Sequence, residues 1–351
     1  MHLDQPQAIY ADDTINLPQL RAFLQEEAPA MDKIWNVSQF VGGFSNLTYC
    51  LHTAEKDYVL RRPPRGAAIQ SAHDMAREFR VLTLLQGHYR PVPVPVLYCE
   101  NPAVIGAPFY LMERLPGVIL RPSNTPQMNL APELLRQIAS SLVDNLVAMH
   151  ALDIEATGLA QLGRPEGYVE RQVEGWTKRY RLAETDSIPA MNNIATWIAE
   201  HPPVSQEPTL LHNDYKFDNL ILDPNDLTQV RGVLDWEMAT VGDPLMDVGA
   251  MLAYWMEAGD GETARQYNIT WLPGQPTRQE VADRYAHQSG RYLSGIMFYY
   301  VFGLFKNAVI AQQIYARWKK GHSQDARFGR LLPLVVELAE RAEKALNTGR
   351  L

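Results

Sequence analysis

Cysteine is scarce in this sequence: Cys50 and Cys99 are the only two in 351 residues. Their placement gives neither a disulfide framework nor a zinc motif, so we expect a reducing compartment and a cytoplasmic location. Long apolar runs are also missing. The longest nearly uncharged stretch, residues 292–305, is too short to span a bilayer and predicts a buried helix. The first residues lack the basic and apolar regions of a signal peptide, so we expect no membrane partner.

Basic charge is in deficit as well. The net charge is −8 and the pI is near 5.6, with no basic tail or stripe, so we expect no nucleic-acid partner. A hydrophobic content of 46% and a charged content of 21% are typical of a soluble globular protein. A chain of 351 residues suits two domains rather than one. The sequence carries no signal for an oligomeric state.

The most informative segment is residues 212–219, which has the form His-x-Asp-x-Lys-x-x-Asn. A short apolar strand follows it, and a second strand ends at Asp235. This layout is typical of a phosphoryl-transfer loop followed by a metal-binding aspartate. Transfer of a phosphoryl group from ATP requires positioning and charge neutralisation more than covalent chemistry. The segment therefore predicts ATP as donor, Mg²⁺ as cofactor and a small-molecule hydroxyl as acceptor.

The residues of this segment have separate expected roles. Asp214 is the predicted catalytic base, which accepts the proton of the attacking hydroxyl or orients that hydroxyl. Lys216 is expected to reach the transferred phosphate. Asn219 and Asp235 are the predicted metal ligands, because Mg²⁺ prefers hard oxygen atoms and usually keeps several waters. His212 is expected to pack beneath the loop. The alternative is a polar turn between two strands that merely contains these residue types.

Three further carboxylates are expected to have structural rather than catalytic roles. Asp218 is expected to stabilise the loop. Asp243, directly before Pro244, is typical of a helix N-cap with proline at the first helical position. Asp247 is expected to support the catalytic loop through hydrogen bonds.

The pattern of apolar residues changes along the chain. A helix is predicted over residues 17–28. Period-two patterns then predict five strands, over residues 38–41, 46–52, 58–61, 96–99 and 109–113. A helix over residues 71–86 is predicted between the third strand and the fourth. Beyond Gly117 the pattern is helical apart from the catalytic hairpin at 209–236: 131–150, 166–183, 190–200, 244–257, 278–291, 293–319 and 327–347.

This order predicts an α+β, protein-kinase-like fold of two lobes, with an antiparallel N-lobe sheet and a mostly helical C-lobe. The expected divisions are an N-terminal helical extension over residues 1–34, an ATP-covering N-lobe over 35–115, and a C-lobe over 116–351 that holds the catalytic loop and the acceptor site. The catalytic residues are expected to line the cleft between the lobes.

These motifs resemble the aminoglycoside phosphotransferase family, the kinase-like group that also includes choline and homoserine kinases. His212, Asp214 and Asn219 match its catalytic loop, and Asp235 matches its second-metal position. The resemblance extends over residues 35–320. Within the family the chain is most similar to the branch fused to acyl-CoA dehydrogenases in some eukaryotes. The segments that carry this similarity are residues 41–46, 59–64, 234–237, 242–244 and 306–310.

The resemblance implies an ATP site in the first lobe. Small residues there would let backbone amides approach the phosphates, although a Gly-Gly pair is also an ordinary hairpin turn. The phosphate-covering positions are Gly42, Gly43, Ser45 and Asn46. Met112 and Glu113 fall at the hinge whose backbone would meet adenine.

The third strand departs from the family pattern. Arg61 stands where the family usually has a lysine that pairs with a helix glutamate, and Glu78 is the expected partner. Arginine can bridge phosphate oxygens, but its planar fork is not equivalent to a lysine. An edge-strand charge and a solvated helix face are the alternatives for these two residues. This departure motivates a second hypothesis, a catalytically silent nucleotide-binding regulatory module.

The acceptor side carries less information. Lys306 and Arg317 fall on one helical face, where two cations would meet an anionic acceptor. Favourable placement near a helix C-terminus explains them equally well. The resemblance to the acyl-CoA-dehydrogenase-linked branch suggests a hydroxyacyl thioester or hydroxy acid, with Arg62 or Arg65 as further cations. An amino alcohol, a sugar or an aminoglycoside is the alternative acceptor.

Overall fold

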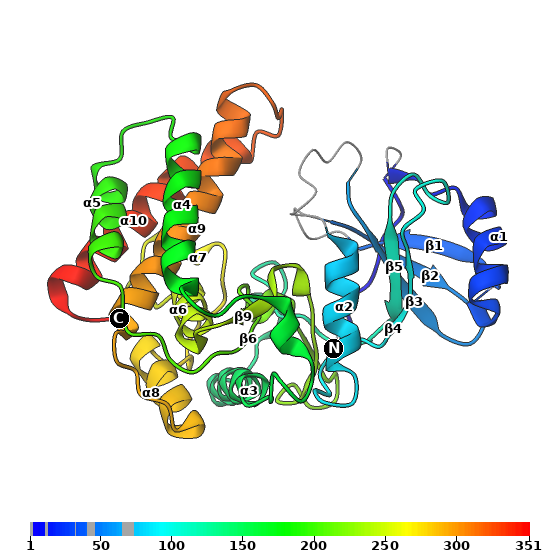
Figure 1. Cartoon of the computed structure of the whole chain (residues 1–351), viewed down its shortest axis with the longest axis horizontal. Helices are drawn as coiled ribbons and strands as arrows, with labels where there is room; N and C mark the ends of the chain where they lie inside the picture. The colour runs from blue at the N-terminus through cyan, green and yellow to red at the C-terminus, as the bar shows by residue number, and fades with distance from the viewer. Residues whose placement is uncertain (1–2, 11–12, 32, 41–45, 65–73) are drawn as a thin grey trace. The chain divides into compact units, whose positions relative to one another are not determined.

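The computed structural model describes residues 3–10, 13–31, 33–40, 46–64 and 74–351. The chain divides into two compact units (Figure 1). The first comprises Met1–Ile119 and Leu220–Ala239, and the second comprises Leu120–Asn219 and Thr240–Leu351. The segment Leu220–Ala239, which the sequence assigned to the C-lobe, therefore belongs to the first unit.

The first unit is built on a five-stranded antiparallel sheet with the strand order β1-β2-β3-β5-β4. The strands are β1 (Asn36–Gln39), β2 (Leu47–His52), β3 (Asp57–Arg62), β4 (Pro95–Cys99) and β5 (Phe109–Glu113). Its helices are α1 (Leu17–Glu27), the short η2 (Pro29–Met31) and α2 (Met75–Leu85). The predicted antiparallel sheet with one helix between its third and fourth strands is confirmed.

Alternation along the strands explains how both faces of the sheet are covered. Tyr49 and Leu51 of β2 are fully buried in an apolar cluster with Leu20 and Leu24 of α1. On the other face, the ring of Tyr110 in β5 lies 6.2 Å from that of Phe79 in α2. The sheet consequently lies between α1 and α2, as Figure 1 shows, and burial of apolar area on both sides stabilises it.

A short ribbon completes the first unit. Strand β7 (Leu220–Leu222) pairs with β8 (Val230–Val233), and the turn η7 (Trp236–Met238) follows. Val118 forms a bridge to Leu222, and the Val233 amide donates to the carbonyl of Pro91 at 2.7 Å. These bonds tie the strand before Asp235 to the chain segments around the sheet.

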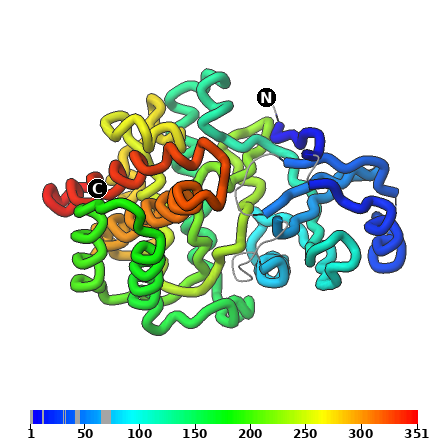
Figure 2. Tube along the Cα trace, turned by 90° about the horizontal axis from the view of Figure 1, so that it is seen from above, coloured from blue at the N-terminus to red at the C-terminus, as the bar shows by residue number. Residues whose placement is uncertain are grey.

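The second unit is mostly helical, as predicted. Its helices are α3 (Pro132–His150), α4 (Tyr168–Ala183), α5 (Pro189–Glu200), α6 (Pro244–Tyr254), α7 (Glu262–Arg265), α8 (Arg278–Ser289), α9 (Ile296–Lys319) and α10 (Leu332–Thr348). The short turns are η4 (Thr125–Met128), η5 (Leu159–Leu162), η6 (Phe217–Asn219) and η8 (Phe328–Arg330). Helices α9 and α10, orange and red in Figure 2, run side by side.

Some boundaries differ from prediction. Helix α10 begins at Leu332, because residues 328–330 form a separate turn. The predicted strand, turn and second strand leading to Asp235 are confirmed as the pairing of β7 with β8, but β6 (Thr209–Leu211) pairs with β9 (Thr240–Gly242), a strand that was not predicted. A strand of three residues such as β9 is too short to show a period in sequence. Among the described residues, no helix has the length and apolarity that a bilayer crossing requires.

Helices α6 and α9 cross closely because glycine lies at the contact. A Cβ added to Gly249 of α6 would lie 2.3 Å from the carbonyl oxygen of Tyr299 in α9. A Cβ added to Gly303 of α9 would lie 2.6 Å from the carbonyl oxygen of Gly249. Both helices supply residues to the catalytic loop described below, so this crossing fixes their spacing.

Candidate active site

The segment that holds the predicted base runs from β6 into η6 and belongs to the second unit. Asn213 has φ +65°, a left-handed conformation that is uncommon for a non-glycine residue. The Asp214 amide donates to His212 Nδ1 at 3.2 Å, and His212 is fully buried. His212 therefore packs beneath the loop, as predicted.

Asp247 of α6 holds this loop from below. Its Oδ2 accepts from the His212 amide and its Oδ1 from the Asn213 amide, both at 2.6 Å. His150 Nε2 lies 3.3 Å from Oδ2, and the other ring nitrogen contacts the Tyr285 hydroxyl at 2.8 Å. Burial opposes ionisation, but the hydrogen bond and charge of His150 hold the pKa of Asp247 below its usual value. The predicted supporting role of Asp247 is confirmed.

The start of α6 is capped as the sequence indicated. Asp243 Oδ1 accepts from the Leu245 amide at 2.9 Å, with Pro244 at the first helical position. Its Oδ2 accepts from the Gln206 amide at 2.9 Å and from the Tyr299 hydroxyl at 2.6 Å. The cap therefore also ties α6 to α9.

The carboxylate of Asp214 receives hydrogen bonds from three side chains of its own unit. Lys216 Nζ lies 3.0 Å from Oδ1 and 2.8 Å from Oδ2. The Tyr254 hydroxyl donates to Oδ1 at 2.8 Å, and Asn219 Nδ2 donates to Oδ2 at 2.9 Å. Burial would raise the pKa of Asp214, but Lys216 and Tyr254 bring that pKa below its usual value. The carboxylate is therefore ionised at neutral pH.

The neighbours of Asp214 are themselves well defined. Lys216 Nζ lies 4.7 Å from the centre of the Tyr254 ring, and the partners Tyr254 and Asp214 outweigh burial and raise the pKa of Lys216. Asn219 uses its Nδ2 twice, because it also donates to the Asp214 carbonyl at 2.8 Å. Its Oδ1 accepts no hydrogen bond from the residues that the structure describes, which leaves an amide oxygen for a cation. Burial raises the pKa of Asp218, whose loop-stabilising role stays a prediction.

The structure separates the two cations predicted for the acceptor. Lys306 is buried, and its Nζ donates to the Asn213 carbonyl at 2.6 Å and lies 5.7 Å from the Trp176 ring centre. Burial lowers the pKa of Lys306. Arg317 is exposed in the last turn of α9, roughly 16 Å further along the helix axis at the usual rise per residue. They are not brought together, and Lys306 contacts the loop backbone.

The candidate nucleotide residues gather in the first unit. Arg61 Nε lies 3.4 Å from Glu78 Oε2, an ion pair without hydrogen-bond geometry, and Arg61 Nη2 donates to Asp235 Oδ1 at 2.9 Å. The predicted Arg61–Glu78 pair is confirmed. Burial raises the pKa of Glu78, although the charge of Arg61 opposes this. Asp235 adopts φ +69°, and its side chain is 29% exposed.

Other predicted nucleotide positions lie around these residues. Asn46 Nδ2 donates to Glu237 Oε2 at 2.8 Å. Met112 lines a narrow recess with Arg61, Glu78 and Asp235, whereas Glu113 pairs with Lys56 at the end of β5. Gly42, Gly43 and Ser45 lie outside the described residues, as does Arg65.

Arg62 lies on the opposite face of the sheet from Arg61. It is 1% exposed, donates through Nη1 to the Ile105 carbonyl at 3.3 Å, and places its guanidinium 5.9 Å from the Tyr49 ring centre. Tyr49 and Ile105 belong to the apolar cluster beneath α1. A role for Arg62 toward the acceptor stays a prediction.

The two sets of predicted site residues therefore fall in different units. Asp214, Lys216 and Asn219 belong to the second unit, whereas Arg61 and Asp235 belong to the first. The expectation that both sets line one cleft stays a prediction.

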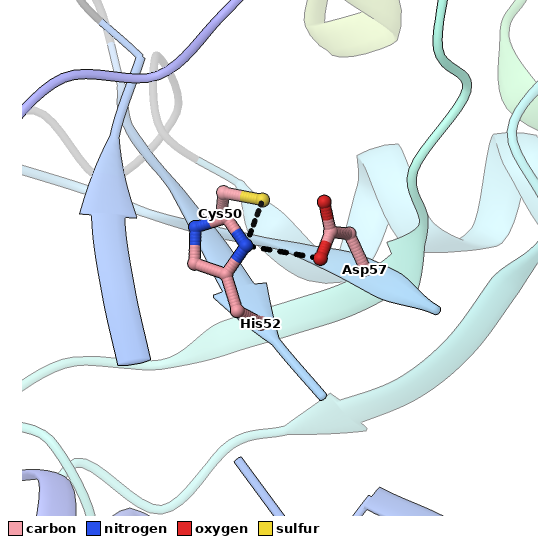
Figure 3. A group of neighbouring side chains, drawn as sticks. All are labelled: Cys50, His52 and Asp57. Carbon is pink, nitrogen blue, oxygen red and sulfur yellow. Dashed lines mark hydrogen bonds and ion pairs between the residues drawn. The ribbon is translucent and has the colours of Figure 1, made fainter. Parts of the chain in front are cut away.

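A separate cluster on β2 and β3 contains Cys50, His52 and Asp57, whose ligand-type atoms all lie within 4.8 Å of one another (Figure 3). His52 Nδ1 lies 3.0 Å from Asp57 Oδ1, and Ser38 Oγ lies 2.6 Å from His52 Nε2. Arg114 Nη1 donates to Asp57 Oδ2 at 2.6 Å and lies 4.0 Å from Cys50 Sγ. Burial and the charge of Asp57 raise the pKa of Cys50 to about 12. A protonated thiol beside a guanidinium disfavours a metal, so we interpret the cluster as an ion-pair network.

Sequence reasoning missed two residues of these sites. Tyr254, the last residue of α6, contacts Asp214 from 40 positions away. Glu237 accepts a hydrogen bond from Asn46, which lies 191 positions away in the sequence. Glu237 stood in the segment that carried the family resemblance, which was the available signal, whereas nothing in the sequence marked Tyr254.

The chain is similar to proteins of a known family. The profile of the phosphotransferase enzyme family, APH, matches residues 36–284. A curated relative, acyl-CoA dehydrogenase family member 10 of Mus musculus, is 38% identical over 308 residues, which are 86% of this chain and 28% of that protein. The chain thus spans under a third of that relative's length. The predicted similarity to the acyl-CoA-dehydrogenase-linked branch is confirmed.

Solved structures give the same result for the fold. A protein of Ralstonia eutropha JMP134, provisionally assigned as an aminoglycoside phosphotransferase, is 32% identical with a TM-score of 0.77, covering 94% of this chain and 99% of that one. A ternary complex of the aminoglycoside phosphotransferase APH(2")-IIa with streptomycin and ATP is 17% identical with a TM-score of 0.56, covering 85% and 91%. The predicted kinase-like fold is confirmed.

Proposed function

Because the chain belongs to the phosphotransferase enzyme family, we propose that it transfers the γ-phosphoryl group of ATP, with Mg²⁺, to a hydroxyl of a small molecule. The observation that carries this proposal is the Asp214 carboxylate, held ionised and aimed by Lys216, Asn219 and Tyr254. ATP as donor agrees with the cytoplasmic location that the scarcity of cysteine predicts.

The chemistry assigned to Asp214 is simple. The acceptor oxygen forms a bond to the γ-phosphorus, and the bond from that phosphorus to the β–γ bridging oxygen breaks, leaving ADP. The proton of the acceptor hydroxyl passes to the Asp214 carboxylate. Lys216, which lies beside the same carboxylate, supplies positive charge near the transferred group. These residues position the acceptor hydroxyl and neutralise negative charge on the transferred group, which are the main requirements of phosphoryl transfer.

The donor set for a divalent cation is suitable. Asn219 in the second unit offers a free amide oxygen and Asp235 in the first a partly exposed carboxylate, both hard oxygen ligands of the kind Mg²⁺ takes. A cation held by such ligands would supply charge neutralisation on the phosphates. Arg61, oriented by Glu78, is the protein's own cation toward the nucleotide.

A cavity in the second unit supports an acceptor with an apolar part and a negative end. It measures about 250 Å³. Its lining is Pro122, Pro126, Arg265, Gln266, Asn268, Ile269, Trp271 and Leu272. The Arg265 guanidinium lies 5.5 Å from the Trp271 ring centre, and no lining residue carries a carboxylate. A polycationic aminoglycoside needs acidic partners, so we favour a hydroxy acid or hydroxyacyl thioester, a choice that the name of the mouse relative also supports.

The test is an ATP-consumption screen of the purified chain with Mg²⁺ against hydroxyacyl-CoAs, hydroxy acids, amino alcohols, sugars and aminoglycosides. We expect turnover with a hydroxy acid or its thioester. Turnover with aminoglycosides alone would overturn the acceptor class and leave the phosphotransferase mechanism standing. Absence of Mg²⁺-ATP binding at millimolar concentration would overturn the mechanism itself.

One observation favours a second candidate, a nucleotide-binding regulatory module without turnover. Arg61 replaces the usual lysine and is bonded to Asp235 at 2.9 Å, which ties a predicted metal ligand to a guanidinium. This candidate predicts Mg²⁺-ATP binding with neither hydrolysis nor transfer to any acceptor. Binding by calorimetry, compared with ADP release in the same buffer, separates the two functions.

A further inference from the structure

The Asp214 carboxylate is occupied by donors of its own chain, and these donors differ in kind. Lys216 and Asn219 belong to the same loop, two and five residues away. Tyr254 comes from the end of α6 and donates its hydroxyl to Oδ1 at 2.8 Å. Among the donors that the structure describes around Asp214, Tyr254 alone carries a hydroxyl. Its bond to the carboxylate has the length and donor type that an acceptor alcohol would use.

Rigid elements set the position of this hydroxyl. The Tyr254 carbonyl accepts from Asn268 Nδ2 at 2.6 Å. Helix α6 is fixed at its other end by the Asp243 cap and in its middle by the close crossing at Gly249. Burial and the charge of Asp214 raise the pKa of Tyr254, so the phenol stays protonated and always donates. Tyr254 as a whole is only partly buried.

One residue links Tyr254 to the cavity proposed for the acceptor. Asn268, which donates to the Tyr254 carbonyl, also lines the cavity that contains Arg265 and Trp271, whereas Tyr254 and Asp214 are not among its lining residues.

We propose that the Tyr254 hydroxyl occupies the acceptor-hydroxyl position on Asp214 in the free protein, and that a productive acceptor displaces it. This inference rests on the proposed function and deepens it, because it makes Tyr254 a specificity-determining residue of the acceptor site. While the phenol fills the position, water is kept from Asp214, and ATP hydrolysis without acceptor is suppressed. An acceptor that cannot displace the phenol is not phosphorylated.

The deciding variant is Tyr254→Phe, which keeps the ring beside Lys216 and removes the hydroxyl. Water then takes the vacated position: its oxygen bonds to the γ-phosphorus, the β–γ bridging bond breaks to give ADP, and its proton passes to Asp214. We expect ATP hydrolysis without acceptor to rise about threefold to tenfold, the scale of one lost hydrogen bond. The KM for an acceptor found in the screen should fall by a similar factor, with kcat nearly unchanged.

Tyr292→Phe is the matched control, because Tyr292 is 83% exposed and its substitution should leave the hydrolysis rate unchanged.

The outcomes separate this inference from the proposed function. If the wild-type protein hydrolyses ATP and Tyr254→Phe hydrolyses it at the same rate or more slowly, the displacement model is wrong and the phosphotransferase proposal stands. If the wild-type protein neither binds nor hydrolyses Mg²⁺-ATP, both are wrong. Circular dichroism and the melting temperature, compared with Tyr292→Phe, show whether the variant keeps its fold. Tyr254→Leu, which removes the ring as well, should also raise hydrolysis, and a fall there would equally contradict displacement.

Discussion

The ammonium of Lys306 donates a hydrogen bond of 2.6 Å to the carbonyl of Asn213. Asn213 has φ +65°, and its amide donates a hydrogen bond to Asp247. The residue directly before the predicted base is therefore fixed in an uncommon conformation by two buried charges from α6 and α9. Removing either charge should release that conformation.

Replacing Lys306 with methionine tests this relationship. Lys306→Met keeps much of the side-chain volume and leaves the Asn213 carbonyl without its donor. We expect turnover to fall between about 10-fold and 100-fold, because small displacements of a catalytic group carry that cost. Affinity for Mg²⁺-ATP should change little, since Arg61, Glu78 and Asp235 lie in the other unit. Steady-state kinetics and calorimetry measure the two effects.

The matched control is Lys319→Met on the same helix, where the lysine is exposed and pairs with Asp186. It should keep wild-type kinetics. If Lys306 instead binds the acceptor, as the sequence suggested, Lys306→Met would raise the acceptor KM and leave kcat intact. That pattern would contradict the positioning role.

Asp214 and Asp235 should fail in different ways. Asp214→Ala removes the predicted base and should lower turnover at least about 100-fold while ATP affinity stays close to wild type. Asp235→Ala removes a metal ligand and the partner of Arg61, so it should weaken Mg²⁺-ATP binding itself. Calorimetry with and without Mg²⁺ distinguishes them. Asp283→Ala, at an exposed position of α8, is the control. Near wild-type turnover of Asp214→Ala on a true acceptor would refute the assignment.

Local patterns explain why much of the fold was predictable. In α3, the buried residues Leu135, Ile138, Leu142 and Leu146 recur at helical spacing, and in β2 neighbouring side chains point to opposite faces. The spacing within residues 212–219 is likewise a local feature, because Asp214 and Asn219 meet within one turn of chain. Such features depend on neighbours in sequence and can be seen without the fold.

The remaining features depend on long-range packing. Tyr254 reaches Asp214 only because α6 folds back over the loop, and Lys306 reaches Asn213 from 93 positions away. Sequence periodicity placed Lys306 and Arg317 on one face of α9. It could not show that the Lys306 ammonium is hydrogen-bonded to the backbone carbonyl of Asn213. Strand β9 was missed because three residues gain their strand conformation from pairing with β6, not from their own pattern.

Asp247 should make the second unit sensitive to acid. Its pKa is lowered in the folded protein, so the unfolded chain takes up the proton first as pH falls. The stability it contributes is fully present above its unfolded pKa of about 3.9, and it is lost as pH falls through the lower folded value. Asp247→Asn should lower the free energy of unfolding at pH 7 by about 2–4 kcal/mol. The side-chain NH₂ of the new asparagine cannot accept a hydrogen bond, so the backbone amide of His212 or Asn213 loses its acceptor.

In addition, the Asn variant should flatten the dependence of stability on pH below about pH 4. Urea unfolding at pH 7, 5, 4 and 3 measures both effects. Asp283→Asn serves again as the exposed control. An equal loss of stability for wild type and Asp247→Asn between pH 5 and 3 would contradict the role assigned to Asp247.

The crossing of α6 and α9 should tolerate no side chain at Gly249. In Gly249→Ala the new Cβ would lie 2.3 Å from the Tyr299 carbonyl oxygen and 2.4 Å from its carbonyl carbon, which are backbone atoms that cannot rotate away. The helices must separate, and overpacking of this kind costs about 1–3 kcal/mol. Gly259→Ala is a matched control, because nothing lies within 4 Å of its Cβ position. Thermal unfolding should show a lower melting temperature for Gly249→Ala alone.

The turnover of Gly249→Ala should fall as well, because Tyr254 and Lys306 approach the catalytic loop from these two helices. A Gly249→Ala protein with wild-type melting temperature and turnover would show that the spacing of α6 and α9 does not set the geometry around Asp214.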